Sequence, residues 1–137
     1  MIGASVSVTA TTGAVKDAAD KATAENVGQA AGRIRKDAIA SMTPSDTPSP
    51  PGQPPHTHGG RNRKGKGKLP KSILFAVDKS AGDAVIGPAR SKAGTVGQAH
   101  EFGGRYKGEQ FAERPFMGPA LDRQQTKFAA SFAGSIG

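Results

Sequence analysis

Residues 71–89 read KSILFAVDKSAGDAVIGPA, and this stretch decides the fold. Two short apolar runs, Ser72–Asp78 and Ala84–Pro88, flank the link KSAGD. A five-residue link that contains glycine, set between two such runs, is typical of a β-hairpin. The sequence therefore predicts an antiparallel hairpin in the middle of the chain.

Upstream of the hairpin, the pattern predicts a strand and then a long helix. Residues 2–10 alternate apolar residues with small or hydroxyl residues, which is the period of a half-buried strand. Residues 14–42 contain no proline and repeat Ala and apolar residues mostly at spacings of three or four. Thr12 can cap this helix, and Pro44 stops it from continuing much past Ser41.

Two glycines lie inside the long helical pattern. Gly28 and Gly32 each cost a helix about 1 kcal/mol relative to Ala. Because small residues let another backbone approach closely, we expect this helix to pack tightly against a neighbour. A single helix is the main interpretation, and a break near Gly28 is the alternative.

Residues 43–68 combine six prolines with glycines and a cationic run, a composition that predicts a loop or extended segment outside the core. Insertions of this length without secondary structure are uncommon in compact domains and tend to be functional or disordered. We therefore expect residues 43–71 to form an extended Pro-rich and basic arm.

Downstream of the hairpin, residues 90–98 read as a polar loop, and Tyr106–Phe111 can add another strand. Pro119 lies where the first turn of a helix tolerates proline. Behind it, apolar residues recur at spacings of seven, four and four, which predicts an amphipathic C-terminal helix. These residues are Leu121, Phe128, Phe132 and Ile136. The predicted class is α+β, a small antiparallel sheet packed by the two helices in a single domain, 1–137.

Two motifs between the hairpin and the last helix direct the chain path. In HEFGG, residues 100–104, Phe102 is expected to anchor in the core, and Gly103 permits a positive φ or a close backbone approach. In ERPFMGPAL, residues 113–121, Pro115 keeps Arg114 extended and Phe116 can enter the core. Arg114 could bind nearby carboxylates such as Glu101 or Glu113, with a solvated side chain as the equal alternative.

Composition and charge limit the class of protein. The chain has 137 residues, 19 Gly, 10 Pro, no Cys and only 35% hydrophobic residues, so any core is small and burial against a partner or a second copy is expected. No stretch approaches the roughly 20 apolar residues of a membrane span, and the N-terminus lacks the basic region of a secretion signal. The net charge of +8 favours contact with polyanions or acidic protein surfaces.

The positive charge is concentrated in one run without acidic residues. Such flexible Lys/Arg segments bind nucleic-acid phosphates without sequence specificity. The alternative interpretation is a solvated loop or a segment docked on acidic protein. No aromatic residue is interleaved to stack on bases. The six basic residues are Arg61, Arg63, Lys64, Lys66, Lys68 and Lys71.

Catalytic and metal-binding motifs are not found in the sequence. His56 and His58 form an H-x-H pair, but no Cys or paired carboxylate completes a zinc site. Glu101, Glu109 and Glu113 have no accompanying nucleophile and base. The sequence thus predicts neither an enzyme nor a cofactor.

Taken in order, the PPGQPP loop, the Gly/basic stretch before LPKSI, EFGG and RPFMGPAL resemble the small tail-completion and neck proteins of long-tailed bacteriophages and prophages. The resemblance spans residues from about 50 to 136. This sequence differs from the family pattern in its long Pro-rich insertion and in Pro70. It is carried by Leu69, Ser72, Ile73, Glu101, Phe102, Gly103, Arg114, Pro115, Phe116, Pro119, Ala120 and Leu121.

The resemblance implies a virion structural protein, made in the host cytoplasm, that forms a homo-oligomeric ring around the DNA channel. Its neighbours would be connector or stopper proteins and tail terminator or tail tube proteins, with non-specific contact to genomic DNA and none to membrane. A closed ring needs heterologous contacts, in which one face of each copy meets a different face of the next. The alternatives are a tail terminator, or a basic nucleic-acid-binding protein that works alone.

Overall fold

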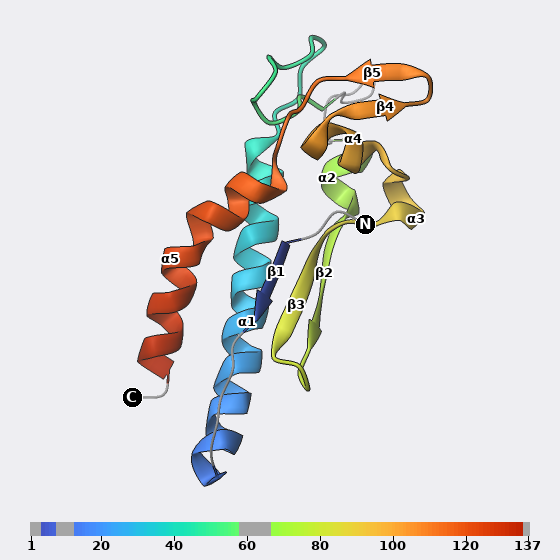
Figure 1. Cartoon of the computed structure of the whole chain (residues 1–137). Helices are drawn as coiled ribbons and strands as arrows, with labels where there is room; N and C mark the ends of the chain where they lie inside the picture. The colour runs from blue at the N-terminus through green and yellow to red at the C-terminus, as the bar shows by residue number, and fades with distance from the viewer. Residues whose placement is uncertain (1–3, 8–12, 58–66, 136–137) are drawn as a thin grey trace.

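The computed structural model describes residues 4–7, 13–57 and 67–135. The described chain is α+β, as predicted, with α5 beside α1 and a small antiparallel sheet on the other side of α1 (Figure 1). In chain order the elements are β1 (Ala4–Ser7), α1 (Gly13–Ser41), α2 (Lys68–Ser72), β2 (Ile73–Asp78), β3 (Asp83–Pro88), α3 (Arg90–Ala93), α4 (Val96–Phe102), β4 (Gly104–Tyr106), β5 (Glu109–Phe111) and α5 (Met117–Ser135).

The predicted hairpin is confirmed as β2 and β3. Ile73 lies opposite Pro88 and Asp78 lies opposite Asp83 in an antiparallel register. The N-terminal strand is also confirmed where the chain is described, because β1 pairs with the other edge of β3 and the strand order is β1-β3-β2. The expected hairpin is therefore part of a three-stranded sheet, whose third strand comes from the N-terminal end of the chain.

The hairpin link is held by Asp78. Its Oδ1 accepts hydrogen bonds from the Ser80 hydroxyl at 2.6 Å, the Ser80 amide at 2.9 Å and the Ala81 amide at 3.1 Å. These bonds, that of the hydroxyl first, lower the pKa of Asp78 below its ordinary value. The Asp78 carboxylate thus supplies acceptors for turn amides that have no partner in the strand ladder.

Helix α1 runs from Gly13 to Ser41 without interruption, so the alternative of a break near Gly28 is wrong. The close approach occurs at alanines, since Ala30, Ala31 and Ala38 are fully buried. The glycines take little part in it. A Cβ at Gly28 would lie 3.8 Å from Val77, an ordinary contact, and a Cβ at Gly32 would meet no atom within 4 Å.

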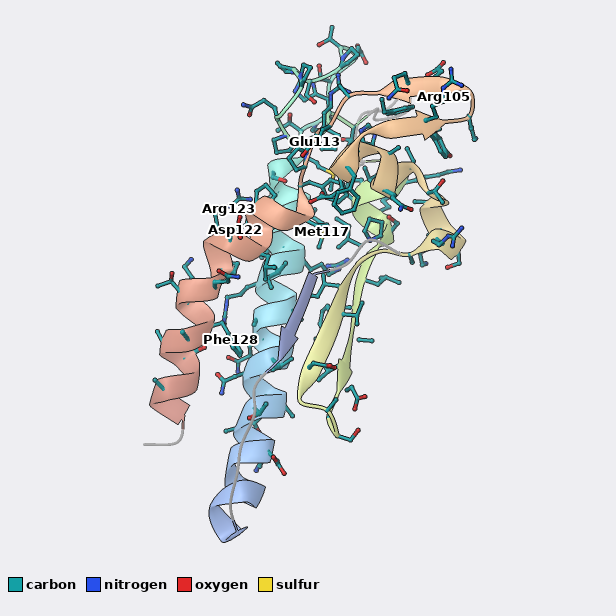
Figure 2. All side chains as sticks on the ribbon, in the orientation of Figure 1. Arg105, Glu113, Met117, Asp122, Arg123 and Phe128 are labelled. Atoms are coloured by element: carbon teal, nitrogen blue, oxygen red, sulfur yellow. The ribbon has the colours of Figure 1, made fainter. Side chains whose placement is uncertain are left out.

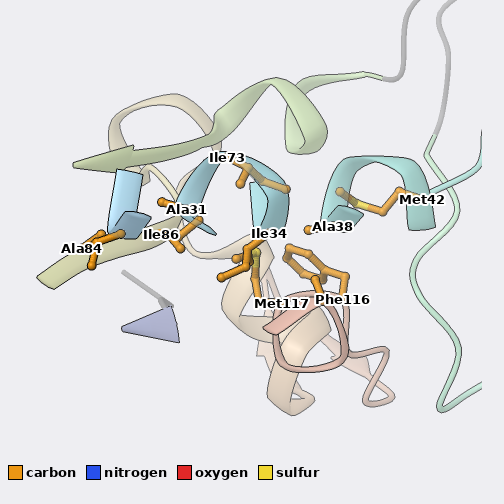
Figure 3. Close-up of a cluster of buried hydrophobic side chains, with 11 residues drawn as sticks. Ala31, Ile34, Ala38, Met42, Ile73, Ala84, Ile86, Phe116 and Met117 are labelled. Carbon is orange, nitrogen blue, oxygen red and sulfur yellow. The ribbon is translucent and has the colours of Figure 1, made fainter. Parts of the chain in front are cut away.

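The core lies where α1 meets the sheet and the start of α5 (Figure 3). Phe116 is the largest fully buried side chain among the described residues, which confirms the prediction that it enters the core. It is joined there by Val27, Ile34, Met42, Ile73, Ile86 and Met117. Leu121 and Phe128 are partly buried against this cluster, as the predicted stripe requires, while the Phe132 side chain and Ile136 lie outside the described residues.

Two predictions downstream of the hairpin are wrong. Residues 90–98, expected as a polar loop, contain α3 and the start of α4. Tyr106–Phe111, expected as one strand, is a separate two-stranded hairpin of β4 and β5. Its turn is formed by Lys107 and Gly108, both at positive φ (50° and 81°), the conformation of a two-residue hairpin turn.

The segment expected as an extended arm is in its described parts packed against the body. Residues 43–57 fold back on themselves, with the Thr57 amide 2.9 Å from the Thr43 carbonyl oxygen. Ser49, Pro55 and Thr57 are buried, so residues 43–57 are packed rather than extended, although none of them belongs to the hydrophobic core, as predicted. The reason is that its proline-rich chain needs few ladder bonds and can lie across neighbouring elements, as Gly52 does by donating to the Glu113 carbonyl oxygen at 2.8 Å.

Candidate interaction surfaces

The basic run predicted from the sequence is described only at its end. Lys68 and Lys71 lie on the short helix α2, both exposed, with Pro70 buried between them in the first turn. Pro70 thus starts a helix here, since proline is tolerated in a first turn. Arg61, Arg63, Lys64 and Lys66 lie outside the described residues.

Helix α3 packs against α2 and extends its positive surface. Arg90 and Lys92 are exposed on α3, and no Asp or Glu occurs in residues 67–77 or 84–100. Sequence reasoning missed these two cations because it treated their segment as a loop unrelated to the basic run. The α2–α3 face, meaning Lys68, Lys71, Arg90 and Lys92, is therefore a candidate surface for polyanions.

In the EFGG motif, Glu101 enters the interior of the molecule and Phe102 does not. Phe102 is 66% exposed, so its predicted role as a core anchor is wrong. Glu101 is 5% exposed and points to the start of α5. Gly103 ends α4 with φ at 72°, and a Cβ there would lie 3.3 Å from the Phe111 oxygen and the Glu113 nitrogen, so its predicted close approach is confirmed.

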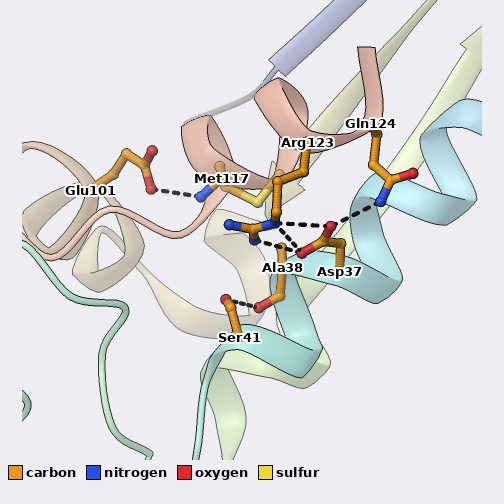
Figure 4. Close-up of polar contacts among 7 residues, drawn as sticks. All are labelled: Asp37, Ala38, Ser41, Glu101, Met117, Arg123 and Gln124. Atoms are coloured by element: carbon orange, nitrogen blue, oxygen red, sulfur yellow. Dashed lines mark hydrogen bonds and ion pairs between the residues drawn. The ribbon is translucent and has the colours of Figure 1, made fainter. Parts of the chain in front are cut away.

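Glu101 binds the backbone of the RPFMGPAL motif (Figure 4). Its Oε2 accepts from the Phe116 and Met117 amides at 2.8 and 2.9 Å, and its Oε1 accepts from the Gly118 amide at 2.8 Å. Pro119 lies in the first turn as predicted, with Ala120 buried and Leu121 partly buried behind it. The two motifs are one structural unit, a carboxylate and the helix start that it caps.

One interpretation of the sequence expected Arg114 to bind Glu101 or Glu113. The structure shows different partners. Its Nε donates to the Ser49 carbonyl oxygen at 2.7 Å, and its amide donates to the His100 carbonyl oxygen at 2.6 Å. Pro115 follows it and leads the chain to Phe116. The arginine therefore attaches residues 43–57 to the chain between β5 and α5.

Helices α1 and α5 are joined by a polar contact on the solvent side of the core (Figure 4). Arg123 forms a forked ion pair with Asp37, through Nε at 3.0 and 3.1 Å and through Nη2, and Gln124 donates to Asp37 at 2.9 Å. The hydrogen bonds from Arg123 lower the pKa of Asp37, and burial opposes them. The pKa of Arg123 is raised for the same reason.

The three-stranded sheet is covered on one face. Cross-strand partners share a face, so Ile73, Ala84 and Ile86 face α1 and are buried. The opposite face carries Leu74, Ala76 and Val85, which are exposed. Strand β2 is an edge strand, and its Phe75, which shares the α1 side of the sheet with Ile86, is also exposed. We call Leu74, Ala76 and Val85, together with this β2 edge and Phe75, the open sheet surface.

The two histidines that the structure describes, His56 and His100, give no sign of a metal centre. His56 Nδ1 lies 2.7 Å from the Thr47 carbonyl oxygen, so this nitrogen carries a proton and donates it. Its partner in the H-x-H pair, His58, lies outside the described residues. Across the part of the chain that is described, no group of three or more His, Cys, Asp or Glu is placed to hold a metal ion.

None of the helices in the described ranges combines the length and apolar character needed to cross a bilayer. The chain matches no protein-family model, no curated protein and no solved structure. The resemblance to phage tail-completion and neck proteins therefore stays a prediction, and function has to be argued from the surfaces.

Proposed function

We propose that the chain is a non-enzymatic structural subunit that binds copies of itself in a ring, as a neck or tail-completion protein of a long-tailed phage. One observation carries the proposal, the open sheet surface. Leu74 and Val85, on the face turned away from α1, are 42% and 47% exposed, and Phe75 on the edge strand is 42% exposed. The motifs named in the sequence analysis supply the phage assignment.

Within the described part of the chain, the outer edge of β2 has main-chain hydrogen-bonding groups without a strand partner. The Ala89 amide donates to the Ser72 carbonyl oxygen at 2.9 Å, and hydrogen-bonded pairs alternate along an antiparallel ladder. The main-chain groups of Phe75 and Val77 therefore point away from β3. Such an edge is a template for pairing with another chain.

Helix α1 protects only the beginning of this edge. Arg35 Nε donates to the Ile73 carbonyl oxygen at 2.7 Å, which blocks that one acceptor. The apolar outer face next to it gives an incoming strand or helix a surface to pack on. The occupant that we propose is the next copy of this chain, because a ring of identical subunits presents the same partner to every β2 edge.

The first experiment measures the oligomeric state of the full chain by native mass spectrometry and light scattering over a range of concentrations. We expect one closed stoichiometry above two. Leu74→Glu and Val85→Glu should give monomers, because each places a charge in a desolvated contact. The control Gln98→Glu adds the same charge at an exposed position of α4 and should leave the assembly intact.

A second experiment tests the phage assignment by itself. Purified particles that carry the gene for this chain should contain the protein at a fixed copy number, located between head and tail in a reconstruction. A chain that forms rings but is missing from particles would keep the self-assembly and remove the phage role. A tail terminator would differ only in the neighbours that it touches.

The α2–α3 face favours a second candidate function, a basic nucleic-acid-binding protein that works alone. In that case the chain stays monomeric and binds duplex DNA with a steep salt dependence, with a slope of about −0.9 for each phosphate contacted. Changing Lys71 and Arg90 to Gln would then reduce the slope by about two. Rings with weak, salt-insensitive DNA binding would exclude this candidate.

A further inference from the structure

A cavity lies where the folded-back loop meets α4 and β5, away from the open sheet surface. Its volume is about 460 Å³, within the roughly 300–1,000 Å³ that ligand pockets occupy. Pro48, Pro55, Val96 and Phe111 contribute apolar walls. The residues that supply its polar groups include Ser49, His56, His100, Glu109 and Arg114.

Among the described residues, Arg114 is the only arginine or lysine that lines this cavity, and its guanidinium is held in position. Nε donates to Ser49, and the backbone on either side is fixed by the bond to His100 and by Pro115. Among the described residues, neither Nη nitrogen forms a hydrogen bond. Glu109 lines the same cavity, but no ion pair between Glu109 and Arg114 is found among the described residues.

Arg123 provides the comparison within the same chain. Its Nε and Nη2 are both bound to Asp37, so its preference for a forked carboxylate is satisfied internally. Arg114 is equally well held but has no carboxylate of its own. Because a guanidinium prefers planar two-oxygen acceptors, the unused side of Arg114 is suited to an incoming carboxylate.

The surroundings favour a carboxylate attached to an apolar group. His56 donates through Nδ1 to Thr47, which leaves its Nε2 as an acceptor for an N–H group of the ligand rather than for the carboxylate. Phe111 and His100 pack edge to face at 5.2 Å and make a firm wall. Apolar walls strengthen a charge-assisted bond, since they keep water from competing.

We infer that this cavity binds a peptide carboxylate, with the Arg114 guanidinium as its anchor and the proline and Phe111 walls holding the neighbouring apolar side chain. This inference does not depend on the ring, because none of its residues belongs to the open sheet surface. It identifies a place where a partner's chain terminus or acidic residue can attach.

The test uses the ¹⁵N-labelled full chain and two probes, N-acetyl-phenylalanine and its uncharged amide. We expect saturable shifts of the amides of residues 49, 56, 111 and 114 with the acid, and at least about tenfold weaker binding of the amide. Arg114→Gln should abolish the shifts. The matched variant Arg105→Gln, an exposed arginine on the β4–β5 hairpin, should leave them unchanged (Figure 2).

Because Arg114 also holds residues 43–57, its loss could disturb the cavity itself. Val96→Phe narrows the cavity and leaves Arg114 in place, so it should also prevent binding while the rest of the spectrum stays folded. Equal binding of acid and amide, or equal losses in the Arg114 and Arg105 variants, would overturn the inference. So would binding of inorganic phosphate in place of the acid, which would assign the site to phosphate.

Discussion

The Glu101 carboxylate caps the helix that begins at Met117. An α-helix leaves its first four amide groups without partners, and here these belong to residues 116–119. Glu101 accepts the first three, and Pro119 has no N–H to satisfy. The first turn of α5 contains no acidic residue, so a carboxylate from α4 supplies the negative charge that a helix start favours.

Removing this carboxylate should destabilise the whole domain. Glu101→Gln keeps the shape but loses the charge and turns an amide donor toward one of the backbone donors. We expect the free energy of unfolding to fall by roughly 2–3 kcal/mol, as for buried hydrogen bonds to charged groups. Urea denaturation measures this, and Glu113→Gln, an exposed residue in the same region, should change stability by less than about 0.5 kcal/mol. Equal effects of the two variants would show that Glu101 does not act as a cap.

The cap was not predictable from the sequence, although both of its halves were noticed. Glu101 and Phe116 are 15 residues apart, and no local pattern links a carboxylate to amides at that distance. Hydrophobicity alone favoured Phe102 as the anchor. The helical phase of α4 decides otherwise by burying Glu101 and exposing Phe102.

The hairpin of β2 and β3 could be predicted because its information is local, in two apolar runs and a glycine-containing link. The same holds for α1 and α5, whose apolar spacing extends over many turns. Helices α3 and α4 are too short for their spacing to show, and they form against neighbours that the sequence does not reveal. The α2–α3 face therefore needed the structure, since it unites charges from two segments.

The ion pair of Asp37 and Arg123 should make the free energy of unfolding depend on pH in the acid range. The pKa of Asp37 is lowered in the folded chain, so its contribution is present above the ordinary value of 3.8 and is lost as the pH falls through the lower folded value. Asp37→Asn should reduce the free energy of unfolding at neutral pH by about 1 kcal/mol, as expected for a partly exposed pair.

The pH dependence distinguishes this charge effect from a loss of packing. Below pH 3.8 the difference between the wild type and Asp37→Asn should shrink. Glu25→Gln, which removes an exposed carboxylate on the same helix, should show no such convergence. A constant difference at every pH would mean that Asp37 acts only through its hydrogen bonds and size.

The β4–β5 turn should respond to residues that favour a left-handed backbone. Lys107 has φ at 50°, a conformation that Asn adopts more readily, so Lys107→Asn should raise the thermal unfolding midpoint. The expected gain is about 0.5 kcal/mol, since a lysine there is only mildly strained. Lys107→Gln controls for the loss of the ammonium, which lies 5.4 Å from the Tyr106 ring centroid, and should give no gain.

Replacing two helical glycines by alanine should change the free energy of unfolding in opposite directions. At Gly97 a Cβ would lie 2.6 and 2.9 Å from the buried ring of Pro88, where α4 crosses the end of β3, so Gly97→Ala should cost about 2 kcal/mol. At Gly32 a Cβ meets nothing within 4 Å, so Gly32→Ala should stabilise α1 by about 1 kcal/mol. Urea denaturation of both variants checks the pair. Stabilisation of both would mean that α4 does not pack on Pro88 as closely as this, because a rigid proline ring cannot yield to a methyl group as a flexible side chain can.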